Sequence, residues 1–222
     1  MEEWTRAEEL IREGRLQEAV QEFERALDQG ASAPAVYLRR GLAWLEAGHL
    51  DEAERDLCRC EPGPRRSRAL GQVYSRLGRH SEARAALREC LATHPEDAES
   101  WLLVARSELA VGRAFRAVMA ATRCIELGSQ AGYAVRAEAQ AARGRAGPAL
   151  QDLLQVDNLP VQGRVYQSLG LLGAAERIWD GALVEAPAEA FFQRGEVRFR
   201  RGRFQDALED YLEAQRLGRP AR

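Results

Sequence analysis

Apolar residues recur along the chain at spacings of three and four, which is typical of amphipathic helices packed on one side. One such series consists of Trp101, Val104, Ala105 and Leu109. The series ends before Gly112, and glycine supplies the left-handed conformation in which helices commonly end. A second apolar series follows each such glycine, and Pro95 prevents one of these second helices from continuing. The pattern therefore predicts pairs of helices joined by short turns.

The helix pairs repeat in register seven times. A small residue is followed after seven positions by glycine, after twelve by alanine and after nineteen by another small residue. The first positions are Ala7, Gly41, Gly71, Ala105, Ala137, Gly163 and Gly195, and the alanines are Ala19, Ala53, Ala83, Ala117, Ala149, Ala175 and Ala207. Small side chains are needed where two helix axes cross closely. Each unit is therefore expected to be a helical hairpin whose remaining apolar face packs on its neighbours.

A unit of about 34 residues with small, glycine, alanine, aromatic and proline positions in this order resembles the tetratricopeptide repeat. The resemblance implies an all-α fold, a right-handed α-solenoid of about seven helix–turn–helix repeats in a single domain, residues 1–222. The expected repeats span residues 1–33, 34–63, 64–97, 98–129, 130–155, 156–187 and 188–221. It also implies a non-catalytic scaffold or adaptor for protein binding, with a concave groove lined by the first helix of each repeat.

Two repeats are shorter than the others. The intervals between the successive alanines are 34, 30, 34, 32, 26 and 32 residues. The second and fifth repeats should therefore have a second helix that is shorter by about one or two turns. The fifth repeat ends near Asn158 and Pro160, residue types that suit the N-cap and the first turn of the next helix.

Composition and charge narrow the kinds of partner. The chain has 222 residues, of which 45% are hydrophobic and 30% are charged, as in ordered proteins. The net charge of −2 argues against a strongly basic nucleic-acid surface. No apolar stretch approaches the roughly 18 residues of a membrane span, and the acidic residues 1–4 do not resemble a secretory signal. We therefore expect a cytoplasmic protein whose partner is another protein, not nucleic acid or a membrane.

Residues suited to catalysis are few. The three histidines fall in or beside the expected turns, at His49, His80 and His94. Neither an HExxH motif, a phosphate-binding glycine loop nor a GxSxG motif is present. The sequence therefore predicts no enzymatic activity and no cofactor.

The cysteines do not form a recognisable metal site. Cys58 and Cys60 form a CxC pair, but no second pair of ligands for zinc accompanies it. Cys60, Cys90 and Cys124 occupy a position that is alanine in other repeats. They are expected to be buried small side chains, too far apart for disulfides.

The expected groove carries both apolar and basic residues. In repeat two the groove face of the first helix carries Leu38, Leu42 and Leu45, and in repeat four it carries Leu102 and Arg106. In repeat three it is a basic stripe, formed by Arg65, Arg68, Gln72 and Arg76. This combination suits a peptide or helix with apolar anchors and an acidic or carboxyl-terminal group. The alternative is that the leucines belong to the core and that the stripe is a solvated face.

The carboxyl end of the chain suggests a different function. Leu208, Tyr211 and Leu212 have no following repeat to cover them, and an uncapped apolar end favours self-association. A homodimer through the C-terminal repeat is therefore a further expectation. In this alternative the protein is a structural assembly subunit that binds through its ends. A nucleic-acid reader built from similar hairpins is disfavoured by the near-neutral charge.

Overall fold

The structure, a computed structural model, describes residues 5–218; the acidic residues 1–4 and the last four residues lie outside the described range. Within that range the chain forms fourteen helices and no strand, so the predicted all-α fold of helical hairpins is confirmed. The helices are α1 (Thr5–Arg12), α2 (Leu16–Asp28), α3 (Ala33–Ala47), α4 (Leu50–Cys58), α5 (Pro64–Arg76), α6 (His80–Thr93), α7 (Ala98–Ala110), α8 (Ala114–Glu126), α9 (Ala131–Ala142), α10 (Ala146–Leu153), α11 (Leu159–Ser168), α12 (Leu172–Ala182), α13 (Pro187–Arg200) and α14 (Phe204–Arg216).

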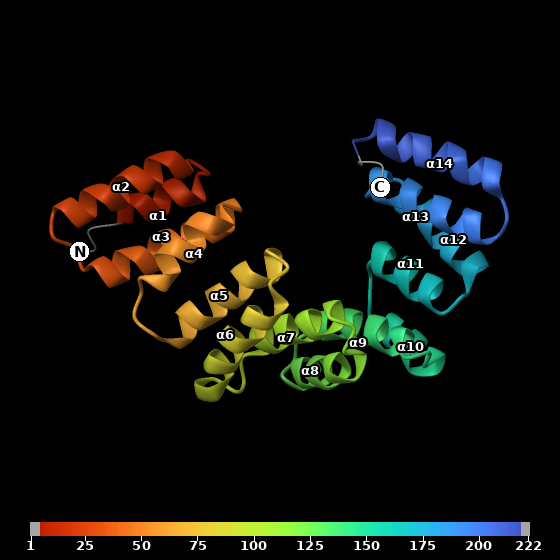
Figure 1. The fold of residues 1–222 in the computed structure, drawn as a ribbon, viewed down its shortest axis with the longest axis horizontal. Helices are drawn as coiled ribbons and strands as arrows, with labels where there is room; N and C mark the ends of the chain where they lie inside the picture. The colour runs from red at the N-terminus through yellow and green to blue at the C-terminus, as the bar shows by residue number, and fades with distance from the viewer. Residues whose placement is uncertain (1–4, 219–222) are drawn as a thin grey trace. The chain divides into compact units, whose positions relative to one another are not determined.

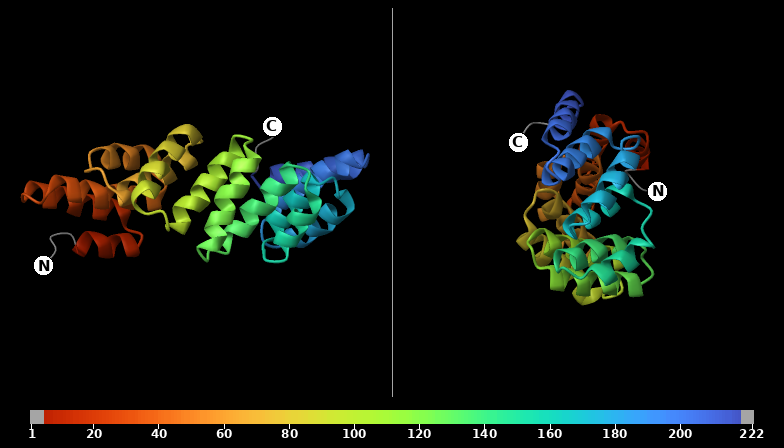
Figure 2. Two further views of the ribbon diagram at one scale, coloured as in Figure 1. Left: turned by 90° about the horizontal axis from the view of Figure 1, so that it is seen from below. Right: turned by 90° about the vertical axis from the view of Figure 1, so that its right-hand side faces the viewer.

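The chain divides into two compact units, Met1–Val111 and Gly112–Arg222, and each is described by itself. In the first unit α1 packs on α2, α3 on α4 and α5 on α6, as Figure 1 shows. Each of these pairs contacts the next through α2 with α3, α4 with α5 and α6 with α7. In the second unit α9 packs on α8 and α10, α11 on α12, and α13 on both α12 and α14. The two further views in Figure 2 show the same order of neighbours within each unit.

A glycine ends the first helix of each hairpin. The seven turn glycines have φ values from 71° to 84°, the left-handed conformation expected from the sequence. At Gly48 the next amide, from His49, donates a hydrogen bond of 2.9 Å to the Trp44 carbonyl. This bond satisfies a carbonyl that the end of the helix would otherwise leave free.

The two helices of a hairpin touch at the small residues of the repeat. A methyl group on Gly71 would lie 2.6 Å from the side chain of Leu87, and one on Gly163 would lie 2.5 Å from the ring of Trp179. Gly41 and Gly195 are crowded in the same way, by Leu57 and Tyr211. In each case the large residue follows the glycine by sixteen positions. The helix axes can therefore approach closely only because the first residue has no side chain.

The alanines of the repeat are buried as their position requires. Ala19, Ala53, Ala83, Ala117, Ala149 and Ala175 have no exposed surface, and Ala207 has 1%. Cys60, Cys90 and Cys124 are buried and free, as predicted, whereas Cys58 is exposed. The core of each unit is therefore a row of small residues interleaved with large ones such as Phe23 and Trp179.

The second helix is short in the second and fifth repeats, as the sequence predicted. α4 has nine residues and α10 has eight, compared with thirteen in α2, α8 and α14. After α10 the chain turns into α11, where the amide of Val161 donates a 2.9 Å hydrogen bond to Oδ1 of Asn158. The predicted N-cap at Asn158 is therefore confirmed, with Pro160 in the first turn.

We expect Gly163→Ala to lower the free energy of unfolding by about 1–3 kcal/mol, because its methyl group would overlap the fully buried Trp179 ring. Helix propensity alone would predict a rise in the free energy of unfolding, since alanine is a better helix former than glycine. Urea denaturation followed by circular dichroism measures the change.

Gly181→Ala is the matched control, because Gly181 lies in α12 and a methyl group there would meet only Leu159, at 3.5 Å. It should leave stability unchanged or raise it by up to about 1 kcal/mol. Equal stability changes in the two variants would contradict the close-approach explanation.

Candidate functional site

A hollow of about 590 Å³ opens on the first unit among α3, α5 and α7. Its apolar lining consists of Leu42, Leu45, Leu102, Leu103 and Ala110. Its polar lining consists of Glu46, Gln72, Ser75, Arg76, His80, Glu99, Arg106 and Ser107. Three consecutive hairpins therefore contribute their first helices to one recess, which we call the α3–α5–α7 hollow.

The arrangement of the first helices produces this hollow. α5 contacts α3 on one side and α7 on the other, so the three helices lie next to one another. On α7, Glu99, Leu102 and Arg106 are spaced by three and four residues and share one face. On α5, Gln72 and Arg76 are four residues apart and share the face that lines the same hollow.

The leucines of the predicted groove divide between the core and the hollow. Leu42 and Leu102 are half-buried and line the hollow. Leu45 lines it as well, but it is 5% exposed and belongs to the core cluster with Leu57 and Val73. Leu38 and Leu42 both pack against that cluster, but Leu38 is not among the residues that line the hollow. Of the predicted leucines, Leu42 and Leu102 thus line the hollow with part of their surface exposed.

The basic stripe of α5 is largely occupied by contacts within the chain. Arg68 lies 3.4 Å from a carboxylate oxygen of Asp97 and 3.4 Å from one of Glu99. Gln72 donates a 2.6 Å hydrogen bond to Glu99, and Arg76 donates a 2.7 Å bond to the Leu45 carbonyl. Asp97 is the N-cap residue of α7 and Glu99 lies in its first turn, so the stripe joins α5 to the first helix of the next repeat as well as facing solvent.

Arg65 and Arg106 differ from the rest of the basic residues. Both are exposed, and within residues 5–218 neither makes a hydrogen bond or an ion pair. Arg106 lines the α3–α5–α7 hollow. Arg65 lines two smaller recesses, of about 320 and 300 Å³, together with Arg68. Of the predicted arginines, Arg106 is therefore the one at the main hollow with an unused guanidinium.

Sequence reasoning missed Glu99, although it contacts two of the predicted residues. Glu99 binds both Arg68 and Gln72 and lines the hollow. It lies three residues before Leu102, on the face that the sequence had identified in repeat four. Extending that face by one turn toward the start of the helix would have found it.

A second set of contacts that sequence reasoning missed repeats along the chain. In three repeats an arginine precedes the first small position and binds an aspartate sixteen residues later with two hydrogen bonds. The pairs are Arg40 with Asp56, Arg136 with Asp152, and Arg194 with Asp210, at 2.6–3.0 Å. An aromatic ring three residues before each arginine lies 5.2–5.6 Å from the guanidinium. Such two-bonded pairs fix the orientation of the two helices of a hairpin.

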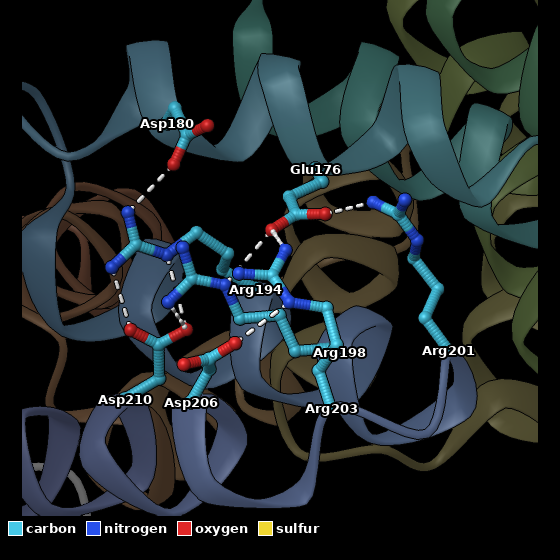
Figure 3. Close-up of polar contacts among 8 residues, drawn as sticks. All are labelled: Glu176, Asp180, Arg194, Arg198, Arg201, Arg203, Asp206 and Asp210. Atoms are coloured by element: carbon cyan, nitrogen blue, oxygen red, sulfur yellow. Dashed lines mark hydrogen bonds and ion pairs between the residues drawn. The ribbon is translucent and has the colours of Figure 1, made fainter.

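The most extensive polar network of the second unit surrounds Glu176, which is 7% exposed on α12 (Figure 3). Arg198, Arg201 and Arg203 all donate to its carboxylate, from α13 and the turn before α14. Burial by itself would raise the pKa of Glu176. The hydrogen bond from Arg198 and the charges of Arg203 and Arg201 outweigh burial and hold that pKa below its ordinary value.

This network extends from Glu176 to the arginine–aspartate pair of the last repeat. Arg198 also donates to Asp210, at 2.9 Å, and Arg194 donates to Asp180, at 2.6 Å. The carboxylates of α12 are thereby joined to the hairpin of α13 and α14 (Figure 3). The contacts connect the sixth repeat to the seventh by charge-assisted hydrogen bonds.

Cys90 has polar neighbours but not the properties of a catalytic nucleophile. Ser100 donates a hydrogen bond to its sulfur at 3.4 Å, and Asp97 lies 3.6 Å away. Burial raises the pKa of the Cys90 thiol. A thiol with a raised pKa stays protonated at neutral pH, whereas a nucleophilic cysteine requires the thiolate.

Metal-ligand clusters and membrane-spanning helices are absent from the described part of the chain. No three histidine, cysteine or carboxylate side chains in that part of the chain gather as metal ligands. Among the described helices, none has the length and apolar character needed to cross a bilayer.

Comparison with known proteins identifies the repeat. Models of the tetratricopeptide repeat match residues 5–62, 64–107 and 161–221. No curated protein matches the sequence.

Solved structures resemble the fold at low sequence identity. A tetratricopeptide repeat protein from Parabacteroides merdae is 16% identical, with a TM-score of 0.80 over 96% of this chain and 91% of that chain. PilW, described as a type IV pilus biogenesis factor, is 19% identical, with a TM-score of 0.70 over 83% and 92%. A repeat protein from Thermus thermophilus is 20% identical, with a TM-score of 0.58 over 78% and 97%.

We expect Glu176→Gln to lower the free energy of unfolding by about 2–4 kcal/mol at pH 7, because it leaves three arginines facing a neutral amide. Glu185→Gln, at an exposed carboxylate on the turn after α12, should change stability little. Urea denaturation measures both.

The effect of Glu176→Gln should depend on pH. The folded-state pKa of Glu176 is below the ordinary value of 4.5, so its stabilising effect is complete above that value and is lost as pH falls through the folded pKa. The stability difference between wild type and variant should therefore shrink in acid. A difference that is the same at pH 7 and in acid would contradict the assigned ionic role.

Proposed function

We propose that this chain, which belongs to the tetratricopeptide repeat family, is a scaffold that binds a segment of a partner protein in the α3–α5–α7 hollow. Members of that family generally serve as non-catalytic protein-binding scaffolds. The observation that carries the proposal is the lining of the hollow by three consecutive first helices. A recess of this kind exposes apolar surface from several repeats to one extended or helical segment. The proposal places the protein in the cytoplasm, in keeping with its four free cysteines.

The lining supports a partner with an apolar anchor. Leu42 and Leu102 stand on different helices with part of their surface exposed in the hollow. Burying such surface supplies most of the free energy of binding at small interfaces, while the polar rim sets orientation. The bound segment should therefore carry at least one leucine-like or aromatic side chain.

The charges of the rim support a carboxylate next to that anchor. Arg106 has its whole guanidinium available, and Arg76 uses one nitrogen on the Leu45 carbonyl and has others to donate. The carboxylate would come from an acidic side chain or from the carboxyl terminus. Glu99 and Glu46 line the same hollow, so a strongly acidic segment would be repelled and a single carboxylate is favoured.

Arg68 and Gln72 have a supporting part in this proposal. Their contacts with Asp97 and Glu99 hold α5 against α7. Arg65 and Leu38 lie beyond the lining of the hollow and would contact only a longer partner segment. This arrangement narrows the expected binding residues to Leu42, Leu102, Arg76 and Arg106.

We expect peptides selected on the wild-type protein from a random displayed library to contain an apolar residue near a carboxylate. Arg106→Glu should weaken the selected peptides at least about tenfold, because it replaces an attractive charge by a repulsive one at the rim. Fluorescence anisotropy with a labelled peptide measures the affinity, and raising the salt concentration should weaken the wild-type complex modestly.

Arg88→Glu is the matched control for charge. Arg88 is an exposed arginine on α6 that lies outside the lining of the hollow. It should bind the selected peptides as the wild type does. If Arg106→Glu bound them with wild-type affinity, or Arg88→Glu weakened them equally, the site would lie elsewhere.

A further inference from the structure

A smaller recess continues the α3–α5–α7 hollow along α5. It has a volume of about 300 Å³, we call it the Arg65 recess, and it is lined by Leu42, Arg65, Arg68, Ala69, Gln72 and Glu99. Leu42, Gln72 and Glu99 line both spaces. The hollow lies beside the carboxyl-terminal half of α5, and the Arg65 recess extends to the first turn of that helix. The two spaces therefore form one continuous track beside α5.

The track has an unpaired cation in each of its two spaces. Arg106 lines the hollow and does not line the Arg65 recess. Arg65 lines the recess, and within residues 5–218 its exposed guanidinium has no ion pair or hydrogen bond. The charge of Arg68 is already shared between Asp97 and Glu99, each 3.4 Å away. An anionic group in the recess would therefore meet the unmatched charge of Arg65.

Building on the proposed function, we propose that the partner segment lies extended along α5 and carries two carboxylates, one bound by Arg106 and one bound by Arg65. The apolar anchor of the segment lies between the two carboxylates, because Leu42 lines both spaces. The single carboxylate that the hollow favours is the first of the two. The second lies outside the hollow, where Glu46 no longer contributes to the lining.

Helix geometry sets the spacing of the two carboxylates. Arg65 and Arg76 mark the two ends of the track on α5 and are eleven positions apart. At about 1.5 Å per residue, they lie about 17 Å apart along the helix axis. An extended segment advances about 3.3 Å per residue and covers this length in about five residues. A helical segment would need about eleven residues for the same length.

The polar residues along the track favour an extended segment over a helix. An extended segment has backbone N–H and C=O groups that need partners, whereas a helix pairs these groups internally. Gln72, where the two spaces meet, donates to Glu99, and its amide oxygen accepts no bond within the described residues. That oxygen can accept a bond from a backbone N–H of the partner. Arg76 has further N–H groups for a backbone carbonyl, since it uses one on Leu45.

The other recess beside Arg65 suits a carboxylate less well. That recess, of about 320 Å³, is lined by Arg65 and Arg68 but also by Glu96 and Asp97. In the Arg65 recess the same two arginines face Glu99 alone. A carboxylate of the partner would be repelled more strongly in the first case than in the second. The second carboxylate is therefore assigned to the Arg65 recess.

Peptides selected on the wild-type chain test the spacing. A displayed library of random peptides about sixteen residues long covers both the extended and the helical spacing. The selected peptides should carry two acidic positions about five residues apart, with an apolar position between them. Acidic positions about eleven residues apart would overturn the extended conformation. Peptides with only one acidic position would overturn the second carboxylate.

A double-mutant cycle tests the contact with Arg65, measured by fluorescence anisotropy with a labelled selected peptide. Arg65→Gln should weaken binding about fivefold, and so should replacing the second acidic residue of the peptide by its amide. The two changes together should weaken binding no more than either alone, because both remove the same contact. Arg88→Gln is the matched control, since Arg88 is exposed on α6 and lines neither space. It should bind as the wild type does, and circular dichroism verifies the folding of both variants.

The outcomes separate this partner from the proposed function. If Arg65→Gln binds as the wild type does while Arg106→Glu weakens binding, the second carboxylate is wrong and the proposed function stands. The same conclusion follows if the two losses in the cycle multiply. If Arg106→Glu binds the peptides with wild-type affinity, the proposed function fails and the two-carboxylate partner fails with it.

Discussion

The close approach of two helices within each hairpin is the constraint on which the rest of the structure depends. In four hairpins a glycine on the first helix leaves room for a large side chain that follows sixteen positions later, and Gly163 with Trp179 is the tightest example. The distance between the two helices of a hairpin determines where the outer faces of that hairpin lie. Those faces in turn set how the next pair stacks, and the stacking of α3, α5 and α7 forms the hollow.

Apolar packing alone would let such helices slide along one another, and the arginine–aspartate pairs restrict that freedom. A guanidinium that makes two hydrogen bonds to one carboxylate accepts only one register between the two helices. Arg40, Arg136 and Arg194 provide this contact within three hairpins, and each also reaches back to the preceding helix. The same side chains therefore orient helices within a repeat and between repeats.

The fold could be predicted from the sequence because one local rule recurs seven times, so each copy supports the interpretation of the others. The short helices α4 and α10 were predicted from the spacing of the alanines alone. Helical periodicity also placed Leu42, Leu102 and Arg106 on faces that the structure brings to one hollow. The acceptors of Arg68 and Gln72 could not be predicted, because Asp97 and Glu99 lie at the start of α7 and reach α5 only through stacking.

Within each unit the helix–helix contacts join elements one or two places apart in the chain. Such a topology has low contact order, so folding can proceed by adding one hairpin at a time without closing long loops. A gene for such a chain can gain or lose a whole hairpin, and the remaining ones keep their neighbours. The length of the protein is therefore open to change by duplication. The size of the side chains where the two helices of a hairpin touch is not, because larger ones would clash.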